Sequence, residues 1–195
     1  MLRELLKRYI PASIKKYLRR FIKTRPSKAR RESNLWLVSH ASDINGHVLS
    51  IGSGTDGDRE GRKYREYFKN CSSYTTSEVS ADFECDMVLD VRSMPEIDDE
   101  SFDCVFCSGV LEHVDDYASA LKQITRILKR GGILLLGLPF RQAIHGRPND
   151  YWRFTEYGIR FMLRNEYEIL DLGWMNNTVI NFPSAYWVKA KKKRS

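Results

Sequence analysis

Short apolar runs alternate with amphipathic stretches through most of the chain, and this alternation constrains the fold more than any other feature. Nearly continuous apolar strands separated by helices predict an α/β fold, with a doubly wound, mostly parallel sheet of six to seven strands covered on both faces. We expect strands at 47–51, 74–77, 86–89, 102–107, 132–138, 167–172 and 186–190, with helices near 35–38, 59–69 and 115–130.

The helix expected over 115–130 has the clearest boundaries. Asp115 or Asp116 caps its start, and Gly131 ends it. Lys129 and Arg130 suit the negative end of its dipole. A further helix is expected to begin at Thr155 and to place three side chains on its inner side, those of Tyr157, Phe161 and Met162.

One connection is too short for a covering helix. Only residues 78–85 separate the second and third expected strands, whereas a crossover between parallel strands usually needs about a dozen residues. The helix between strands two and three is therefore expected to be missing.

Charge divides the chain into three parts. The net charge of the 195 residues is +7, but residues 1–31 carry +11 and the segment 189–194 carries +5, which leaves the middle of the chain acidic. Residues 1–23 show an apolar helical stripe among basic side chains, and 24–33 are polar and contain Pro26. We therefore expect a basic amphipathic leader and linker over 1–33, a folded domain over 34–190 and a basic tail over 191–195.

The basic leader has four interpretations. It binds an anionic membrane surface, packs on the domain, binds RNA or another acidic partner, or acts as an organelle transit peptide. No apolar run approaches the roughly 18 residues of a membrane span, and four cysteines are too few for a disulfide scaffold. We expect a cytoplasmic protein, with peripheral attachment to the inner face of a membrane as the alternative.

A glycine-rich turn follows the first expected strand. Gly52, Gly54 and Gly57 satisfy the pattern G-x-G-x-x-G, in which glycines let the backbone turn tightly and approach a ligand. Glu78 lies 21 residues beyond Gly57, at the end of the next strand, where a carboxylate can accept hydrogen bonds from ribose hydroxyls. By itself this pattern also fits an NAD-dependent dehydrogenase.

Three segments together carry a more specific resemblance. VLSIGSGTDGD at 48–58, SFDCVFCSGVLEHV at 101–114 and ALKQITRILKRGGILLLGLPF at 120–140 resemble the class I S-adenosylmethionine-dependent methyltransferases, which have a Rossmann-like fold. The continuation HGRPNDYWRFTEYGIRFML at 145–163 is similar to a bacterial subgroup of small methyltransferases. Many relatives in that subgroup belong to cell-surface sugar pathways, which implies a sugar or lipid-linked glycan hydroxyl as the acceptor.

The resemblance implies where S-adenosyl-L-methionine binds. Gly52 and Gly54 would face its methionine part, Glu78 would hold the ribose hydroxyls, and Asp90 would bind the adenine amino group. The residues implied near the sulfonium are Ser108, Gly109 and Leu111, and those implied elsewhere along the cofactor are Ser53, Val91 and His113. All follow the carboxyl ends of expected strands, where open α/β sheets bind ligands.

One position departs from the family pattern. An acid usually stands two residues before the first glycine, near the methionine amino group, and here that residue is Ser50. Asp56, at the usual place of the third glycine, or Asp58 would then have to supply the carboxylate.

The loop after the fifth expected strand, 132–138, is the expected acceptor site. Methyl transfer mainly requires alignment of donor and acceptor, but a hydroxyl acceptor benefits from a base, and His145 is the candidate. Asp150 and Arg153 are candidates for supporting its catalysis, or form a purely structural ion pair. Cys104 and Cys107 lie in an expected buried strand without a second cysteine pair, so we predict buried thiols and no metal site.

Three other functions remain open at this point. The chain could be a non-catalytic module that recruits partners through its basic ends, an RNA methyltransferase, or an NAD-dependent dehydrogenase. Nucleic acid is disfavoured because the domain that would hold the pocket is acidic.

Overall fold

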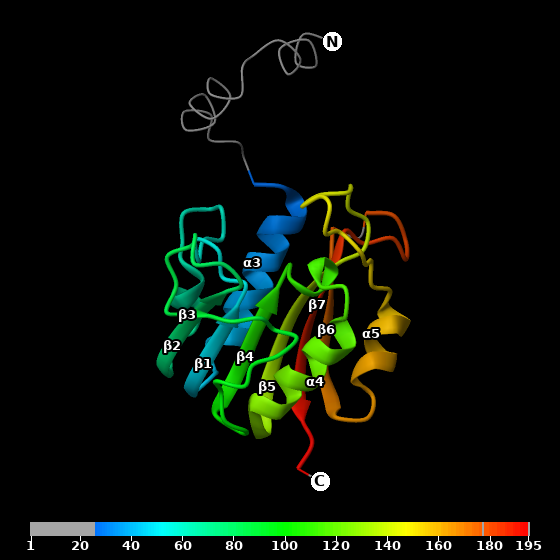
Figure 1. The fold of residues 1–195 in the computed structure, drawn as a ribbon. Helices are drawn as coiled ribbons and strands as arrows, with labels where there is room; N and C mark the ends of the chain where they lie inside the picture. Colours follow the sequence, from blue (N-terminus) through cyan, green and yellow to red (C-terminus); the bar gives the residue numbers. More distant parts are fainter. Residues whose placement is uncertain (1–25, 177, 195) are drawn as a thin grey trace.

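The computed structural model describes residues 26–176 and 178–194, which form one seven-stranded sheet with helices on both faces (Figure 1). The expected leader helix over 1–23 lies outside the described residues, so its membrane, RNA and transit interpretations remain predictions. No helix in the described part is long and apolar enough to cross a membrane.

The sheet has the order β3-β2-β1-β4-β5-β7-β6. The first five strands pair in parallel, and β7 and β6 add an antiparallel edge, which confirms the predicted, mostly parallel sheet. The strands are β1 Gly46–Ile51, β2 Cys71–Glu78, β3 Met87–Val88, β4 Phe102–Ser108, β5 Leu128–Pro139, β6 Tyr167–Met175 and β7 Ala185–Lys192.

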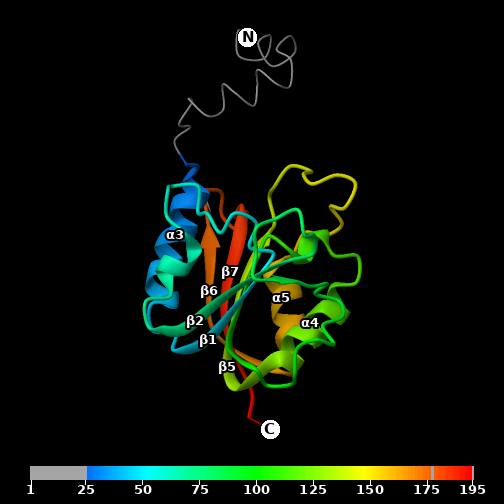
Figure 2. The same ribbon diagram turned by 60° about the vertical axis from the view of Figure 1, so that its left-hand side comes forward.

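Alternate side chains of the central strands enter two separate cores. In β4, Cys104 and Phe106 pack under α3 (Lys28–Ala41), whereas Val105 and Cys107 pack on the opposite face. There they meet α4 (Tyr117–Ile127) and α5 (Glu156–Leu163), which cover that face together (Figure 2). Because successive side chains of a strand point to opposite faces, strands covered on both sides read as continuous apolar runs.

The helix expected over 59–69 is reduced to one 3-10 turn, η1 (Tyr64–Tyr67), so this prediction is wrong. Arg59 and Gly61 take positive φ angles of 65° and 103°, which break a helix. Asp58 accepts hydrogen bonds from the backbone N–H groups of Glu60 and Arg62 and stabilises this bend. The connection between β2 and β3 has no helix, as predicted.

Two helix boundaries also differ from the expectation. The prediction of a linker as far as Ser33 fails because α3 already begins at Lys28, where the Ser27 side chain accepts from the Arg30 N–H. Asp116 caps α4 as expected, but the helix ends at Ile127, not at Gly131. Residues 128–130 are extended because Leu128 pairs with Phe102 of β4 at the start of β5.

The burial of α5 corrects a further prediction. Thr155 caps the helix as expected, but Ile159 and Leu163 are the side chains buried against the sheet. Tyr157 and Phe161, expected inside, are 82% and 66% exposed.

The expected tail is partly structured, because β7 extends through Lys192. Lys189 belongs to the basic segment 189–194, but its side chain is buried, and its ammonium binds the Asp43 carboxylate.

Candidate active site

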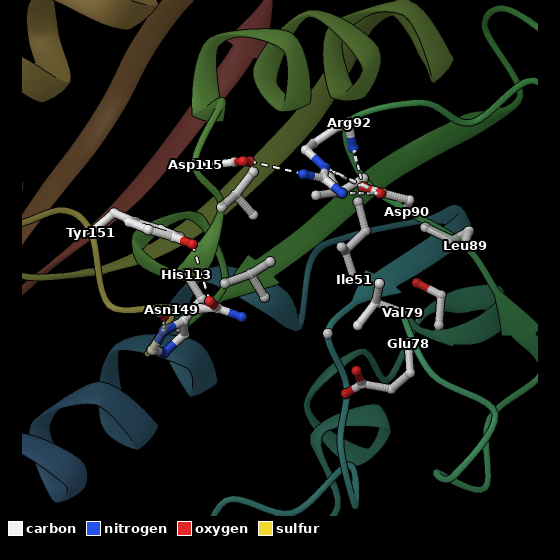
Figure 3. A pocket seen from close by; sticks show the side chains of 16 residues that line it. Ile51, Glu78, Val79, Leu89, Asp90, Arg92, His113, Asp115, Asn149 and Tyr151 are labelled. Atoms are coloured by element: carbon white, nitrogen blue, oxygen red, sulfur yellow. Dashed lines mark hydrogen bonds and ion pairs between the residues drawn. The ribbon is translucent and has the colours of Figure 1, made fainter. Parts of the chain in front are cut away.

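A cavity of about 340 Å³ opens where the parallel strands end (Figure 3). Ile51 ends β1 and Gly52 follows it, Glu78 ends β2, and Gly109 follows β4. Its lining also includes Leu89, Asp90, Val91, Arg92, Val110, His113, Asp115, Asn149 and Tyr151. Of the residues predicted to bind the cofactor, the structure thus brings together Gly52, Glu78, Asp90, Val91, Gly109 and His113.

The turn at Gly52 is one of the places where only glycine fits. Its φ is +65°, and an added Cβ would lie 2.3 Å from Cγ2 of Val110, which stands on the next segment of the cavity wall. Two residues later, the Gly54 N–H donates a hydrogen bond of 2.5 Å to Oε1 of Glu78. The turn is therefore tied to the end of β2, and Oε2 of Glu78 is left to accept from a ligand.

Asp90 lies on the cavity wall but already has a strong partner. Arg92 contacts the Asp90 carboxylate at 2.7 Å and Asp115 at 2.9 Å, and all three line the cavity (Figure 3). The hydrogen bond from Arg92 holds the pKa of Asp90 below its usual range. The sequence pointed to Asp90 and did not identify Arg92, two residues further on.

The acids considered as replacements at Ser50 do not reach the cavity lining. Ser50 is buried inside β1. Asp56 accepts from Tyr74 Oη at 3.0 Å and pairs with Arg65, and Asp58 accepts from Tyr67 Oη at 2.7 Å. Both carboxylates hold the turn after β1 in place, and neither lines the cavity.

Four more residues implied as cofactor contacts also lie outside the lining, namely Gly54, which binds Glu78 as described above, and Ser53, Ser108 and Leu111. Ser53 donates its N–H to the Ser77 carbonyl, Leu111 is fully buried in the core, and Ser108 packs against Gly137. They support the turns that form the cavity.

The loop over 140–154 lies on the short helix η2 (Leu111–His113). The N–H groups of Tyr151 and Trp152 donate to the Glu112 carbonyl at 2.8 and 3.3 Å, and Trp152 Nε1 donates to the Val114 carbonyl. This docking brings Asn149 and Tyr151 to the cavity wall beside His113 (Figure 3). The sequence marked the loop, with the Tyr151 ring in it, as an acceptor site but assigned no role to Asn149.

The three predicted catalytic residues do not line the cavity. Asp150 and Arg153 form a two-pronged ion pair, with contacts of 2.7 and 2.9 Å, and the Asp150 side chain is buried. The hydrogen bond from Arg153 holds the pKa of Asp150 far below its usual range. The same carboxylate accepts from the His145 N–H at 2.7 Å, so it fixes the backbone that carries His145.

Glu112 is a further residue beside the cavity that the sequence reasoning missed. It is only 2% exposed, and burial raises the pKa of its carboxyl. Its Oε1 lies 3.9 Å from His113 Nε2 and 3.8 Å from His145 Nε2. The sequence did contain a signal for it: an acidic residue between Leu111 and His113, in a largely apolar segment, indicates a buried carboxylate.

Cys104 and Cys107 are free, fully buried thiols, as predicted. Burial raises the pKa of both, which keeps them protonated and unreactive.

Comparison with known proteins points to methyltransferases. The sequence model of a methyltransferase domain family matches residues 57–136, which include Glu78, Asp90 and the segment around His113. This stretch of the chain is therefore similar to a methyltransferase domain. Demethylmenaquinone methyltransferase of Staphylococcus epidermidis is 33% identical over 109 residues, a match covering 51% of this chain and 42% of that enzyme.

Solved methyltransferases share the fold of this domain. The N-methyltransferase NodS of Bradyrhizobium japonicum superposes with a TM-score of 0.63 at 15% identity, covering 85% of this chain and 97% of its own. For 1,6-didemethyltoxoflavin-N1-methyltransferase of Burkholderia thailandensis, solved with S-adenosylhomocysteine, the TM-score is 0.62 at 18% identity, with 85% and 78% covered.

Proposed function

We propose that this chain transfers the methyl group of S-adenosylmethionine to a small polar acceptor. The observation that carries the proposal is the cavity at the strand ends, which places the Gly52 turn and the Glu78 carboxylate on one wall. Its volume of about 340 Å³ lies within the range of small-molecule sites.

The residues present fit the cofactor. A carboxylate at the end of the second strand can accept from two ribose hydroxyls, and Glu78 has one oxygen held by Gly54 and one left for a ligand. Leu89 and Val91 provide apolar surface next to Asp90, where an adenine ring would pack. The methionine end would follow the Gly52 turn towards Gly109.

The chemistry requires alignment more than side-chain catalysis. The acceptor atom attacks the methyl carbon in line, a bond forms between them, and the carbon–sulfur bond breaks with its electron pair going to sulfur. A closed cavity that holds donor and acceptor in line supplies most of the rate increase. Asn149 and Tyr151 offer an amide and a phenol on the wall where the acceptor would enter.

We propose a hydroxyl of a sugar or lipid-linked glycan as the acceptor, because the entry wall combines hydrogen-bonding groups with the Tyr151 ring. Asp150 and Arg153 then act as positioning residues that hold this wall, since their ion pair faces the loop and not the cavity.

Calorimetric titration tests the cofactor assignment. The full chain should bind S-adenosylmethionine and S-adenosylhomocysteine, and Glu78→Gln should weaken both at least about tenfold, equal to the loss of one charged hydrogen bond. The exposed Glu168 on β6 provides a matched control, Glu168→Gln, which should leave binding unchanged. Binding of NAD instead, or of none by folded protein, would overturn the proposal.

A further inference from the structure

Three potential metal ligands meet behind the His113 wall of the cavity. Glu112 and His113 come from η2, and His145 comes from the loop after β5, more than thirty residues along the chain. One ligand atom of each lies within 4.8 Å of the other two. The docking of the loop on η2 therefore creates a cluster that no single sequence segment contains.

The Glu112 carboxylate is not satisfied by the protein around it. Its separations from the two imidazole nitrogens, 3.8 and 3.9 Å, are too long for hydrogen bonds. Its other oxygen, Oε2, is buried and has no hydrogen-bond partner among the described residues. Because a buried carboxylate without partners is costly, this pattern points to a positively charged ligand between the three side chains.

Both histidines are oriented with a free nitrogen towards Glu112. His113 Nδ1 lies 2.5 Å from the Asn149 carbonyl, and His145 Nδ1 lies 3.2 Å from the Ala143 carbonyl. Since a carbonyl can only accept, each Nδ1–H donates to it, and Nε2 of each ring is the nitrogen directed towards Glu112. Metal-binding histidines are commonly held in this way, with the second nitrogen donating to a carbonyl.

The backbone around the cluster is held by several contacts. A Cβ at Gly146 would lie 2.7 Å from Cε1 of His113, so this glycine packs directly on the ring. The Asp150 carboxylate accepts from the His145 N–H, and its charge is balanced by Arg153. The ligands are therefore presented on a fixed frame, which lowers the ordering cost of binding an ion.

We propose that Glu112, His113 and His145 bind one divalent transition-metal ion. Two imidazole nitrogens and one carboxylate oxygen form a donor set that suits Zn²⁺, Co²⁺, Fe²⁺ or Mn²⁺ better than Mg²⁺ or Ca²⁺, which prefer oxygen. Ligand bonds of about 2.1 Å place tetrahedral ligand atoms roughly 3.4 Å apart, slightly closer than the present 3.8 and 3.9 Å. The ligand atoms as a group lie within 4.8 Å of one another, so the partly exposed His145 ring would have to move towards the ion, loosening its 3.2 Å contact with the Ala143 carbonyl.

Three protein ligands leave at least one position open on the ion. His113 also lines the cavity, so the ion would adjoin the cavity through this ring, and an acceptor reaching past it could bind at the open position; this role rests on the proposed function, whereas the site itself does not. An acceptor hydroxyl bound there would lose its proton to solvent more readily, and its oxygen would then form the bond to the methyl carbon as the carbon–sulfur bond breaks.

Titration of the full chain with Co²⁺ tests the site, because the visible absorption of Co²⁺ reports its ligand number. We expect one Co²⁺ per chain, displaced by Zn²⁺ and not by equimolar Mg²⁺. Glu112→Gln and His145→Asn should each weaken Co²⁺ binding at least about tenfold. The exposed His47, at the start of β1, provides the control His47→Gln, which should bind Co²⁺ as the native chain does.

The outcomes separate this inference from the proposed function. Absence of stoichiometric Co²⁺ binding, or binding unchanged in Glu112→Gln and His145→Asn, would overturn the metal site. If the buried Glu112→Gln variant fails to fold, the His145→Asn variant, changed at a partly exposed residue, decides the question. Metal-free protein is titrated with S-adenosylhomocysteine in parallel. If it binds S-adenosylhomocysteine and the chain does not bind Co²⁺, only the metal site is rejected. If the chain binds Co²⁺ and the metal-free protein does not bind S-adenosylhomocysteine, only the proposed function is rejected.

Discussion

The two walls of the cavity are built in different ways. The wall proposed to hold the cofactor, called the cofactor wall below, consists of residues at the ends of parallel strands, such as Gly52 after β1 and Glu78 at the end of β2, and the Gly54 N–H joins the two by donating to the Glu78 carboxylate. The opposite wall consists of a long loop that docks on η2 and is held by the Asp150–Arg153 pair. The first wall is a direct product of the sheet, whereas the second depends on contacts between distant segments.

The largest effect should come from filling the turn of the cofactor wall. Gly52→Ala forces a Cβ into a positive-φ position and against Val110, so the free energy of unfolding should fall by about 2–4 kcal/mol. Affinity for S-adenosylhomocysteine should fall at least about tenfold, because the turn must shift. Chemical denaturation and calorimetry measure the two effects.

Gly61 offers a matched control for that change. Its φ is also positive, at 103°, but an added Cβ would meet nothing within 4 Å. Gly61→Ala should therefore cost backbone strain alone, about 1–2 kcal/mol, and leave cofactor affinity unchanged. Equal losses of affinity in both variants would show that the close approach of Val110 is irrelevant.

The next effect should appear on the loop wall only. Arg153→Met removes the partner of Asp150, so the backbone of 143–152 should open more often and exchange its amide hydrogens roughly 10–100 times faster. Cofactor affinity should stay within about twofold, because no cofactor-wall contact changes. Hydrogen exchange by mass spectrometry measures the first quantity and calorimetry the second.

Arg160→Met breaks an exposed pair with Glu156 on α5 and serves as the control. It should leave exchange in 143–152 unchanged. Faster exchange throughout the domain in Arg153→Met would contradict the separation of the two walls.

A smaller effect should follow from the pH dependence of the turn after β1. Burial alone would raise the pKa of Asp58, but hydrogen bonds from Tyr67 Oη and from the N–H groups of Glu60 and Arg62 hold it below its usual value. A lowered folded-state pKa adds stability that is complete above the unfolded pKa of about 3.9 and is lost as the pH falls through the folded value.

Asp58→Asn should therefore lower the free energy of unfolding by about 1–3 kcal/mol at pH 7, and the difference from the native chain should shrink towards pH 3. Urea denaturation at both pH values measures it, with the exposed Asp98→Asn as control. A difference of the same size at pH 3 and pH 7 would show that the charge of Asp58 is not involved.

The smallest effect is expected on the outer face of α5, beyond the loop wall. Tyr157 is largely exposed, so Tyr157→Ser should change the free energy of unfolding by less than about 0.5 kcal/mol and should leave both walls intact. Thermal denaturation and cofactor titration check this. A loss of more than about 2 kcal/mol would restore the inward orientation that the sequence suggested.

Local chemistry made part of the fold predictable. The expected strand segments overlap all seven strands, and capping identified the starts of α4 at Asp116 and α5 at Thr155. The helix expected over 59–69 failed because positive φ angles at Arg59 and Gly61, stabilised by the Asp58 carboxylate, outweighed helix propensity. Tyr157 and Phe161 were misplaced because aromatic character alone does not say which face of a short helix meets the sheet.

For the site, the sequence by itself determined that Gly52, Glu78 and Asp90 would line one cavity, because those residues lie at the ends of strands and strand order brings them together. Tertiary structure alone decided that Arg92 would engage Asp90 and that Asn149 and Tyr151 would reach the cavity. It also brought His145 to Glu112 and His113, across more than thirty residues of chain. Such contacts depend on how a loop docks in three dimensions, and spacing along the sequence carries no record of that docking.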